Sequence, residues 1–238
     1  MNVTGNDLKY FVNVLSALSK YCLDAQIYEG KIRIRSNNRV GLYDIDLPDV
    51  WNVSVNIPIL KSFIDLVKLF IPGDDETVVL DIQDEGTLKK LHIEDDMSEI
   101  DISLGEVQNR FVTDQELKNI GFFDKKYIGS FTLSGKAIDK LKALQKNFSV
   151  SVVTINTLKK KLQIESESKT RFASFNLDSS IENTDECPDM FKFSFLALDF
   201  PFQEEIPLDI QLFKLPNNVY MVGVKQDNVN IYSSAIKQ

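Results

Sequence analysis

The chain has 238 residues, of which 43% are hydrophobic and 10% are aromatic, and its formal net charge is −8. This apolar content can build one large core or two cores of about 100–150 residues each, which excludes a chain that is disordered throughout. The acidic balance argues against a protein that coats nucleic acid over its whole surface, because phosphate repels an acidic surface.

The first half of the chain predicts a helix, strands, a second helix and further strands, in that order. Apolar residues recur at helical spacing from Asn6, a residue type that caps helices, to about Cys22. Pro58 suits the first turn of the second helix, which ends near Phe70. Alternating runs predict strands at residues 25–28, 31–35, 40–47, 51–57, 77–82, 88–94 and 100–104.

The second half repeats this order. Ser134 is placed to cap a helix that ends near Phe148. A polar run at 179–189 predicts a loop, and Pro201 limits the counterpart of the second helix to a short turn. Strands are predicted at residues 127–133, 150–156, 161–166, 171–177, 191–198, 208–214, 218–224 and 229–233.

The two halves match at one fixed offset of 130 positions. Thr4-Gly5 recurs as Ser134-Gly135, and the match continues without a gap to Leu47 and Leu177. Such an offset, half the chain long, indicates two tandem copies of one supersecondary plan. Matched pairs include Leu8 and Ile138, Phe11 and Leu141, Val14 and Leu144, Leu18 and Phe148, Lys31 and Lys161, Ile34 and Ile164, and Ser36 and Ser166.

A connector at residues 105–126 separates the copies. It is largely polar, yet it carries apolar residues that a bare linker does not need: Phe111, Leu117, Phe122 and Phe123. They either pack back on a sheet, which we favour, or line a docking site for a partner.

Lysine is concentrated on the three predicted helices. These helices hold eight lysines against three acids, a net charge of +5, which leaves −13 for the rest of the chain. Glutamate is as good a helix former as lysine but is absent from all three, so helix propensity alone does not explain the bias. The lysines are Lys9, Lys20, Lys61, Lys68, Lys136, Lys140, Lys142 and Lys146.

A basic helical face on an acidic protein suits sequence-independent contact with DNA. DNA carries one negative charge per about 1.7 Å of its axis, and lysines that face it attract it without reading bases. Lysine is a point charge that does not fork onto a base pair, so it suits mobile contact. An acidic exterior keeps nucleic acid from adhering elsewhere.

Tandem copies of helix, strands, helix and strands, acidic overall and with lysine-bearing helices, resemble the DNA sliding clamps. The capped helix and strands from Leu8 to Leu47, and the segment from Pro58 to Ile64, look like the opening and second helix of the T-even-type phage clamp. The two-copy length is similar to that of the trimeric clamps, which include that processivity factor and proliferating cell nuclear antigen. The resemblance covers nearly the whole chain and departs from the family around Pro201, where a lysine-bearing helix is shortened.

The resemblance implies an α+β fold of antiparallel sheets with helices on one face. Clamp domain 1 would cover residues 1–106, the connector 107–126 and clamp domain 2 residues 127–238. Three copies would close head to tail, through edge strands, into a ring whose lysines face duplex DNA. The implied partners are a clamp loader ATPase and a replicative DNA polymerase, with no cofactor and no membrane. A partner peptide would dock near the connector, with Arg39, Val40, Phe122, Phe123 and Ile236 as groove residues, although these also suit ordinary turn, core and terminal positions.

An enzyme is the main alternative class. His92 is the single histidine, and Glu94 follows it in the same run, but no second histidine or cysteine stands at metal-ligand spacing. The sequence contains no glycine-rich phosphate loop and no G-x-S-x-G elbow. We therefore expect no catalytic residue and no metal. A virion or scaffold protein with a duplicated β-rich domain is the other alternative, and it predicts no lysine preference on helices.

The two cysteines do not make a disulfide framework. Cys22 closes an apolar helical stripe and is expected as a reduced core thiol, whereas Cys187 lies in a polar run and is expected to be exposed. Residues 1–4 carry no secretory signal, and the most apolar stretch, 57–72, is too short and too charged to span a bilayer. We expect a cytoplasmic protein, in the host cytoplasm if the chain is phage-encoded.

Overall fold

The computed structural model describes residues 2–20, 22–35, 41–73, 76–84, 89–106, 112–148, 151–166, 168–182, 184–195, 198 and 206–237. The chain divides into two compact units. The first comprises Met1–Asn38 and Asp44–Val112, and the second comprises Arg39–Tyr43 and Thr113–Gln238. In the described part of the chain, no helix has the length and apolar character needed to cross a membrane.

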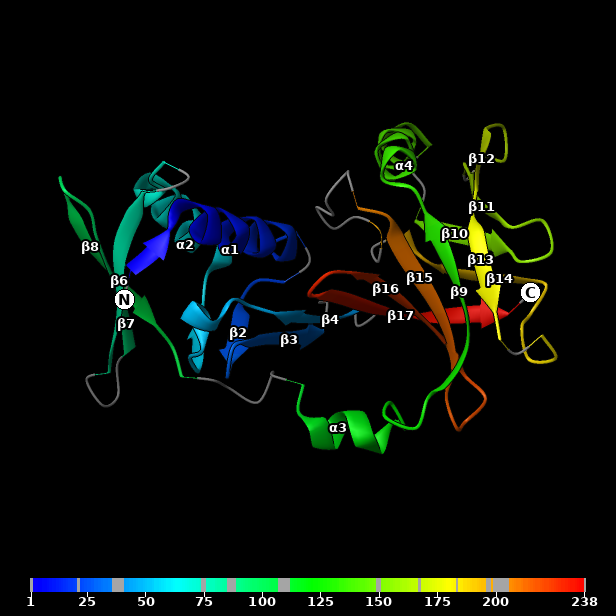
Figure 1. The fold of residues 1–238 in the computed structure, drawn as a ribbon, viewed down its shortest axis with the longest axis horizontal. Helices are drawn as coiled ribbons and strands as arrows, with labels where there is room; N and C mark the ends of the chain where they lie inside the picture. Colours follow the sequence, from blue (N-terminus) through cyan, green and yellow to red (C-terminus); the bar gives the residue numbers. More distant parts are fainter. Residues whose placement is uncertain are drawn as a thin grey trace. The chain divides into compact units, whose positions relative to one another are not determined.

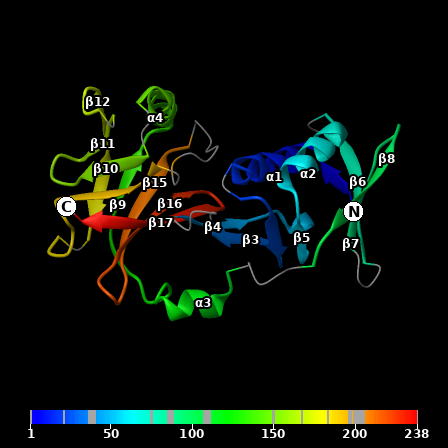
Figure 2. The ribbon, with the colours of Figure 1, turned by 180° about the vertical axis from the view of Figure 1, so that it is seen from behind.

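The first unit contains two four-stranded ladders and two helices, which lie side by side (Figures 1 and 2). One ladder has the order β1-β6-β7-β8 and is antiparallel throughout, and the other has the order β5-β2-β3-β4. The bounds are β1 Asn2–Thr4, α1 Gly5–Leu18, β2 Ala25–Tyr28, β3 Lys31–Arg35, β4 Gly41–Asp46, β5 Val55–Ile57, α2 Leu60–Val67, β6 Thr77–Asp84, β7 Lys89–Glu94 and β8 Glu99–Leu104. Short 3₁₀ helices cover η1 Asp49–Trp51 and η2 Lys68–Phe70.

The second unit contains a nine-stranded antiparallel run in the order β12-β11-β10-β14-β17-β16-β15-β9-β13 (Figure 2). Its helices are α3 Asp114–Asn119 and α4 Gly135–Phe148. Its strands are β9 Lys126–Leu133, β10 Val152–Asn156, β11 Lys161–Glu165, β12 Phe172–Asn176, β13 Asp178–Ile181, β14 Met190–Ser194, β15 Leu208–Lys214, β16 Tyr220–Gln226 and β17 Val229–Lys237.

Both units use one topology. The ladder β1-β6-β7-β8 corresponds to β9-β15-β16-β17, and β5-β2-β3-β4 corresponds to β14-β10-β11-β12. Helices α1 and α4 begin and end 130 positions apart, and so do strands β3 and β11. The ladders of the second unit join where Phe191 of β14 lies opposite Lys237 of β17, and the first unit has a bridge between Asn56 and Gly105 at the same place. The predicted duplication of an α+β domain is confirmed.

The first helix begins and ends earlier than predicted. Thr4, not Asn6, is the N-cap: its Oγ1 accepts a hydrogen bond from the Asp7 N–H at 3.1 Å and donates to Asp7 Oδ2 at 2.8 Å. The helix ends at Leu18, and Cys22 lies beyond it. The buried face of α1 meets a small aromatic core, in which the Phe11 ring stacks on Trp51 with centroids 3.7 Å apart and meets Phe63 edge-on.

Two further strand predictions are corrected. Residues 51–57 do not form one strand, because the Trp51 N–H bonds to the Pro48 carbonyl in a 3₁₀ turn and only Val55–Ile57 pairs as β5. The polar run at 179–189 is not wholly a loop, because Asp178–Ile181 pairs with β9 at the edge of the sheet. The predicted short turn at Pro201 lies outside the described residues.

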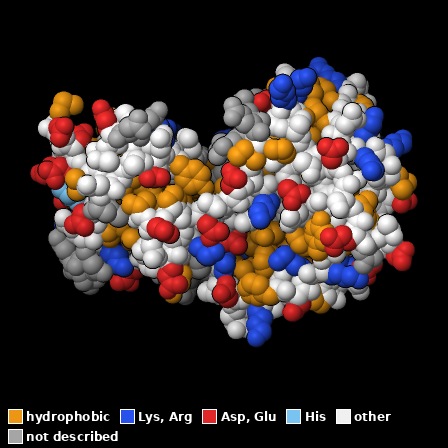
Figure 3. Space-filling model, in the orientation of Figure 1, with side chains coloured by type: hydrophobic (Ala, Val, Ile, Leu, Met, Phe, Trp, Pro, Cys, Tyr) orange, Lys and Arg blue, Asp and Glu red, His pale blue; other side chains and the backbone are white. Residues whose placement is uncertain are grey.

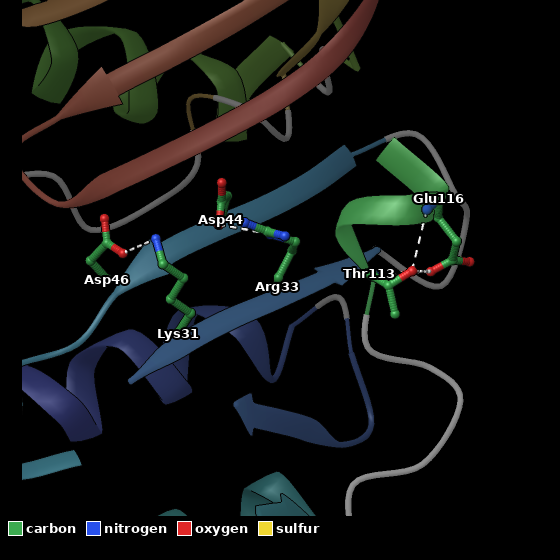
Figure 4. A network of polar contacts seen from close by, with 6 residues as sticks. All are labelled: Lys31, Arg33, Asp44, Asp46, Thr113 and Glu116. Carbon is green, nitrogen blue, oxygen red and sulfur yellow. Dashed lines mark hydrogen bonds and ion pairs between the residues drawn. The ribbon is translucent and has the colours of Figure 1, made fainter. Parts of the chain in front are cut away.

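The connector contains a helix that the periodicity did not predict. Thr113 and Glu116 form a capping box around the start of α3 (Figure 4). The helix stops at Gly121, which has φ 70°, and the Phe122 N–H returns to the Leu117 carbonyl at 2.9 Å. Leu117 and Phe122 are buried, so these two connector residues pack back as favoured, and Phe111 lies outside the described residues.

The cysteines are both free thiols. Cys22 is buried as expected, and burial, with a smaller contribution from the Asp24 charge, raises its pKa to about 12. Cys187 is half-buried rather than exposed, and burial raises its pKa as well. Both thiols therefore stay protonated and poorly nucleophilic at neutral pH.

Candidate nucleic-acid interface

The lysines predicted on the two helices of the first unit differ in exposure and position. On α2 the buried residues are Leu60, Phe63, Ile64 and Val67. Lys61 of α2 and Lys68, the first residue of η2, are exposed, and the exposed Asp65 lies between them in the sequence. Lys9 of α1 is half-buried, and Lys20 is exposed but lies in the turn after the helix rather than on it.

Helix α4 of the second unit carries the clearest basic stripe. Lys136 and Lys140 are exposed one turn apart, and Lys142 is half-buried on the flank. Ile138 and Leu141 form the buried side of the helix. Figure 3 shows basic side chains gathered over α4 and continuing toward β12. The predicted Lys146 side chain lies outside the described part of the chain.

An aromatic cluster holds the connector against strands β15 and β17 of the second unit. Phe122 meets Tyr232 edge-on, with ring centroids 4.9 Å apart, and the ammonium of Lys125 lies 3.9 Å from the Phe122 centroid. The same ammonium lies 5.4 Å from the centroid of Phe213. Gly223 makes room for this cluster, because a Cβ there would come within 3.0 Å of Tyr232 and 3.1 Å of Phe213.

The predicted groove residues have different environments. Phe122 is 5% exposed and belongs to the core of the cluster, whereas its neighbour Phe123 is 55% exposed. Ile236 is 69% exposed on β17, four residues after Tyr232, so strand alternation places both on one face of the sheet. Arg39 and Val40 lie outside the described residues.

Ion pairs cross the hairpin β3–β4 on its exposed side. Lys31 Nζ lies 2.6 Å from Asp46 Oδ1, and Arg33 Nε lies 3.2 Å from Asp44 Oδ1 (Figure 4). These lysine and arginine side chains are held by carboxylates, in contrast to α2 and η2, where one acid lies between two lysines in the sequence. Such cross-strand ion pairs stabilise the hairpin by modest amounts, and the carboxylates neutralise the positive charges.

His92 lies in a row of carboxylates rather than in a metal cage. Its Nδ1 is 2.7 Å from Asp101 Oδ1 and its Nε2 is 3.8 Å from Glu94 Oε2. Among the residues that the structure describes, no group of three histidine, cysteine or acidic side chains is arranged to hold a metal ion.

Neither a protein-family model nor a curated protein sequence matches the chain. Solved structures match it over almost its whole length. The PCNA2–PCNA3 complex of Sulfolobus tokodaii matches with TM-score 0.65 and 13% identity, covering 100% of this chain and 99% of that one. The PCNA of Thermococcus kodakaraensis matches with TM-score 0.63 and 14% identity over 100% and 99%. The proliferating cell nuclear antigen of Entamoeba histolytica matches with TM-score 0.65 and 11% identity over 97% and 96%.

The chain has the fold of the DNA sliding clamps. At these identities the likeness concerns the fold, and it confirms the α+β clamp architecture that the repeat and the lysine-bearing helices predicted. Within this clamp fold, Lys61, Lys68, Lys136 and Lys140 are exposed on the predicted helices.

Sequence reasoning missed two features of the clamp. The first is the anchored helix α3, for which the sequence Thr113-x-x-Glu116 and the Gly121-Phe122 pair were available signals. The second is a contact of Arg171, at the end of the turn between β11 and β12, with Asn147 of α4. The two predicted strands imply the turn, but no local signal marks this contact, because its partners are 24 positions apart in the chain.

Proposed function

We propose that the protein is a DNA sliding clamp, a homotrimeric ring that encircles duplex DNA and tethers a replicative polymerase. The observation that carries this proposal is that one chain has both a duplicated clamp fold and lysines exposed on its helices. Lys61 and Lys68 in the first unit and Lys136 and Lys140 in the second present point charges that suit loose contact with phosphates. The remainder of the acidic chain repels DNA.

Ring closure needs edge strands that can pair between copies. Within the described residues, Glu99–Leu104 of β8 pairs with β7 on one side, and β12 pairs with β11 on one side. Along both strands, more exposed and less exposed side chains alternate. An antiparallel junction between β8 of one copy and β12 of the next would keep this alternation across the two strands. Phe172, 59% exposed at the start of β12, is a large apolar side chain that such a junction would cover.

A partner peptide would dock on the outer face of the second unit. Phe123 and Ile236 are exposed apolar residues: Phe123 meets the Phe122 ring edge-on, and Ile236 lies four residues beyond Tyr232 on the same face of β17. Isolated exposed residues are common, but one at an aromatic cluster in the connector and one on the face of the strand that carries Tyr232 suit an apolar anchor from a polymerase or a clamp loader ATPase. Arg39 and Val40 stay predicted members of this groove.

This role requires no reaction on the clamp itself, so we propose a non-enzymatic protein that works in the cytoplasm, of the host if the chain is phage-encoded. The energy for ring opening would come from the loader.

The mass of the free protein tests the ring. Light scattering at micromolar concentration should give three times the 27.1 kDa chain mass. A stable particle of 27.1 kDa would contradict the trimer. With an active cognate polymerase and loader, the protein should lengthen primer-extension products, and unchanged product length would remove the processivity role.

A further inference from the structure

The turn between β11 and β12 is rich in exposed hydroxyl and cationic side chains. Ser168, Lys169, Thr170 and Arg171 are all exposed. The Ser168 and Thr170 hydroxyls lie 2.7 Å apart, and Ser166 Oγ accepts the Arg171 N–H at 3.1 Å. The Lys169 N–H bonds to the Ser166 carbonyl at 2.8 Å, and Ser166 N–H bonds to the Arg171 carbonyl at 2.9 Å. These hydrogen bonds join Ser166 to Lys169 and Arg171, and Ser168 to Thr170.

A hydrogen bond joins this turn to the end of α4. Arg171 Nη1 donates to the Asn147 carbonyl oxygen at 3.0 Å, where the helix leaves carbonyls without partners inside the helix. A cation is favourable there because the helix C-terminus carries partial negative charge. The guanidinium has five N–H donors, so this contact leaves further donors for a ligand.

The turn continues the basic stripe of the helix. Lys136, Lys140, Ala143 and Asn147 are exposed at spacings of four, three and four residues, which defines one face of α4 about 16 Å long. Arg171 contacts the end of that face at Asn147, so the two lysines and the arginine form one track, and Lys169 is exposed two residues before the arginine. Glu165, the last residue of β11, is exposed, because it lies on the face of the strand opposite to the buried Ile164.

Lys169 occupies a backbone conformation that favours glycine. Its φ is 57°, in the left-handed region, where a residue with a Cβ is strained relative to glycine. Lys160, in the turn at the other end of β11, has φ 50° and the same handicap. This pair of lysines offers a matched comparison, because replacing either one with glycine removes one charge and relieves similar strain.

We propose that Lys169 and Arg171, with the Ser168 and Thr170 hydroxyls, bind phosphodiester oxygens of duplex DNA and extend the α4 track past the end of the helix. This inference rests on the proposed clamp function and names a contact outside the helices. Arginine and lysine supply charge, and hydroxyls donate to phosphate oxygens without reading sequence.

The test is the salt dependence of binding of the full-length protein to a fluorescently labelled duplex, followed by anisotropy. Each lost phosphate contact should make the slope of log K against log salt shallower by about 0.9. K169G should therefore lose about one unit of slope, and K169G with R171A about two, while K160G keeps the slope of the natural protein. K169G should also unfold no more easily than the natural protein, because the strain is relieved.

Two outcomes overturn this inference. Equal slope changes for K169G and K160G would mean that only net charge matters, and an unchanged slope for K169G with R171A would mean that the turn does not contact DNA. The variant K136A with K140A separates the proposals. If it makes the slope shallower and the turn variants do not, the helical face binds DNA and the turn does not. If it also leaves the slope unchanged, the DNA contact of the proposed function fails.

Discussion

His92 and Asp101 face each other across β7 and β8, with Nδ1 of the imidazole 2.7 Å from Oδ1 of the carboxylate. Glu94 lies on the other side of the ring, and Asp81 is opposite His92 on β6. The hydrogen bond that the imidazole donates to Asp101, followed by the charges of Asp101, Glu99 and Glu94, raises the pKa of His92 above its usual value. The hydrogen bond between His92 and Asp101 ties strand β8 to β7.

We predict that D101N lowers the pKa of His92. The protein has one histidine, so an NMR titration of the imidazole protons follows this group without overlap. Because the pKa is higher in the folded state, the pair stabilises the fold fully below the unfolded pKa near 6.5, and this contribution is lost as pH rises through the folded pKa. An unchanged His92 titration in D101N would remove Asp101 as the cause.

Truncation of the two adjacent phenylalanines should affect different properties, stability for Phe122 and polymerase binding for Phe123. F122A should lower the free energy of unfolding by about 3 kcal/mol, because it removes a buried ring from a packed cluster. F123A should change stability by less than about 1 kcal/mol but weaken binding of the cognate polymerase. Urea unfolding and a binding titration measure the two effects. Full polymerase affinity in F123A and in I236A would place the docking site elsewhere.

Gly5 should not tolerate a methyl group, although alanine usually stabilises a helix by about 1 kcal/mol relative to glycine. A Cβ at Gly5 would lie 2.2 Å from the carbonyl oxygen of Gly73, so the helix and the loop after η2 could not keep their approach. We predict that G5A destabilises the protein by about 1–3 kcal/mol in urea unfolding. The exposed neighbour variant N6A is the control and should stay within about 0.5 kcal/mol. A G5A protein as stable as the natural one would show that the approach is not tight.

The sequence predicted the parts of the fold that depend on local periodicity. The apolar stripes of α1 and α4 and the alternation of β3 and β11 were visible in both halves at one offset, and the structure places these elements 130 positions apart. The exposure of Lys61 and Lys140 followed from the same periodicity.

The remaining features depend on contacts between distant residues. Helix α3 has six residues, too few for a periodic signal, and is defined by its caps. Trp51 alternates with Val53 and Val55 as a strand would, but its ring is needed against Phe11, and a 3₁₀ turn brings it there. The contact between Arg171 and Asn147 of α4 joins residues 24 positions apart in the chain.

The proposed subunit junction predicts that a charge at Phe172 opens the ring. F172E would place a carboxylate against β8, which already exposes Glu99 and Asp101, so the particle mass should fall from three chains toward one. F172L keeps an apolar side chain at the same edge position and should leave the mass unchanged. Light scattering at equal protein concentrations measures both variants. A trimer in F172E with unchanged dissociation on dilution would place the junction at another edge.

The most direct test of encirclement is the lifetime of the protein on linear duplex DNA at high salt, with the DNA ends either free or blocked after binding. Biotin at both ends allows streptavidin to be added once rings have threaded. A ring should stay on end-blocked DNA far longer than on open DNA, because sliding off an end is its main exit once salt has screened the lysine contacts. Equal lifetimes on the two substrates would contradict a topological link, since a protein bound to the outside of the helix leaves without needing an end.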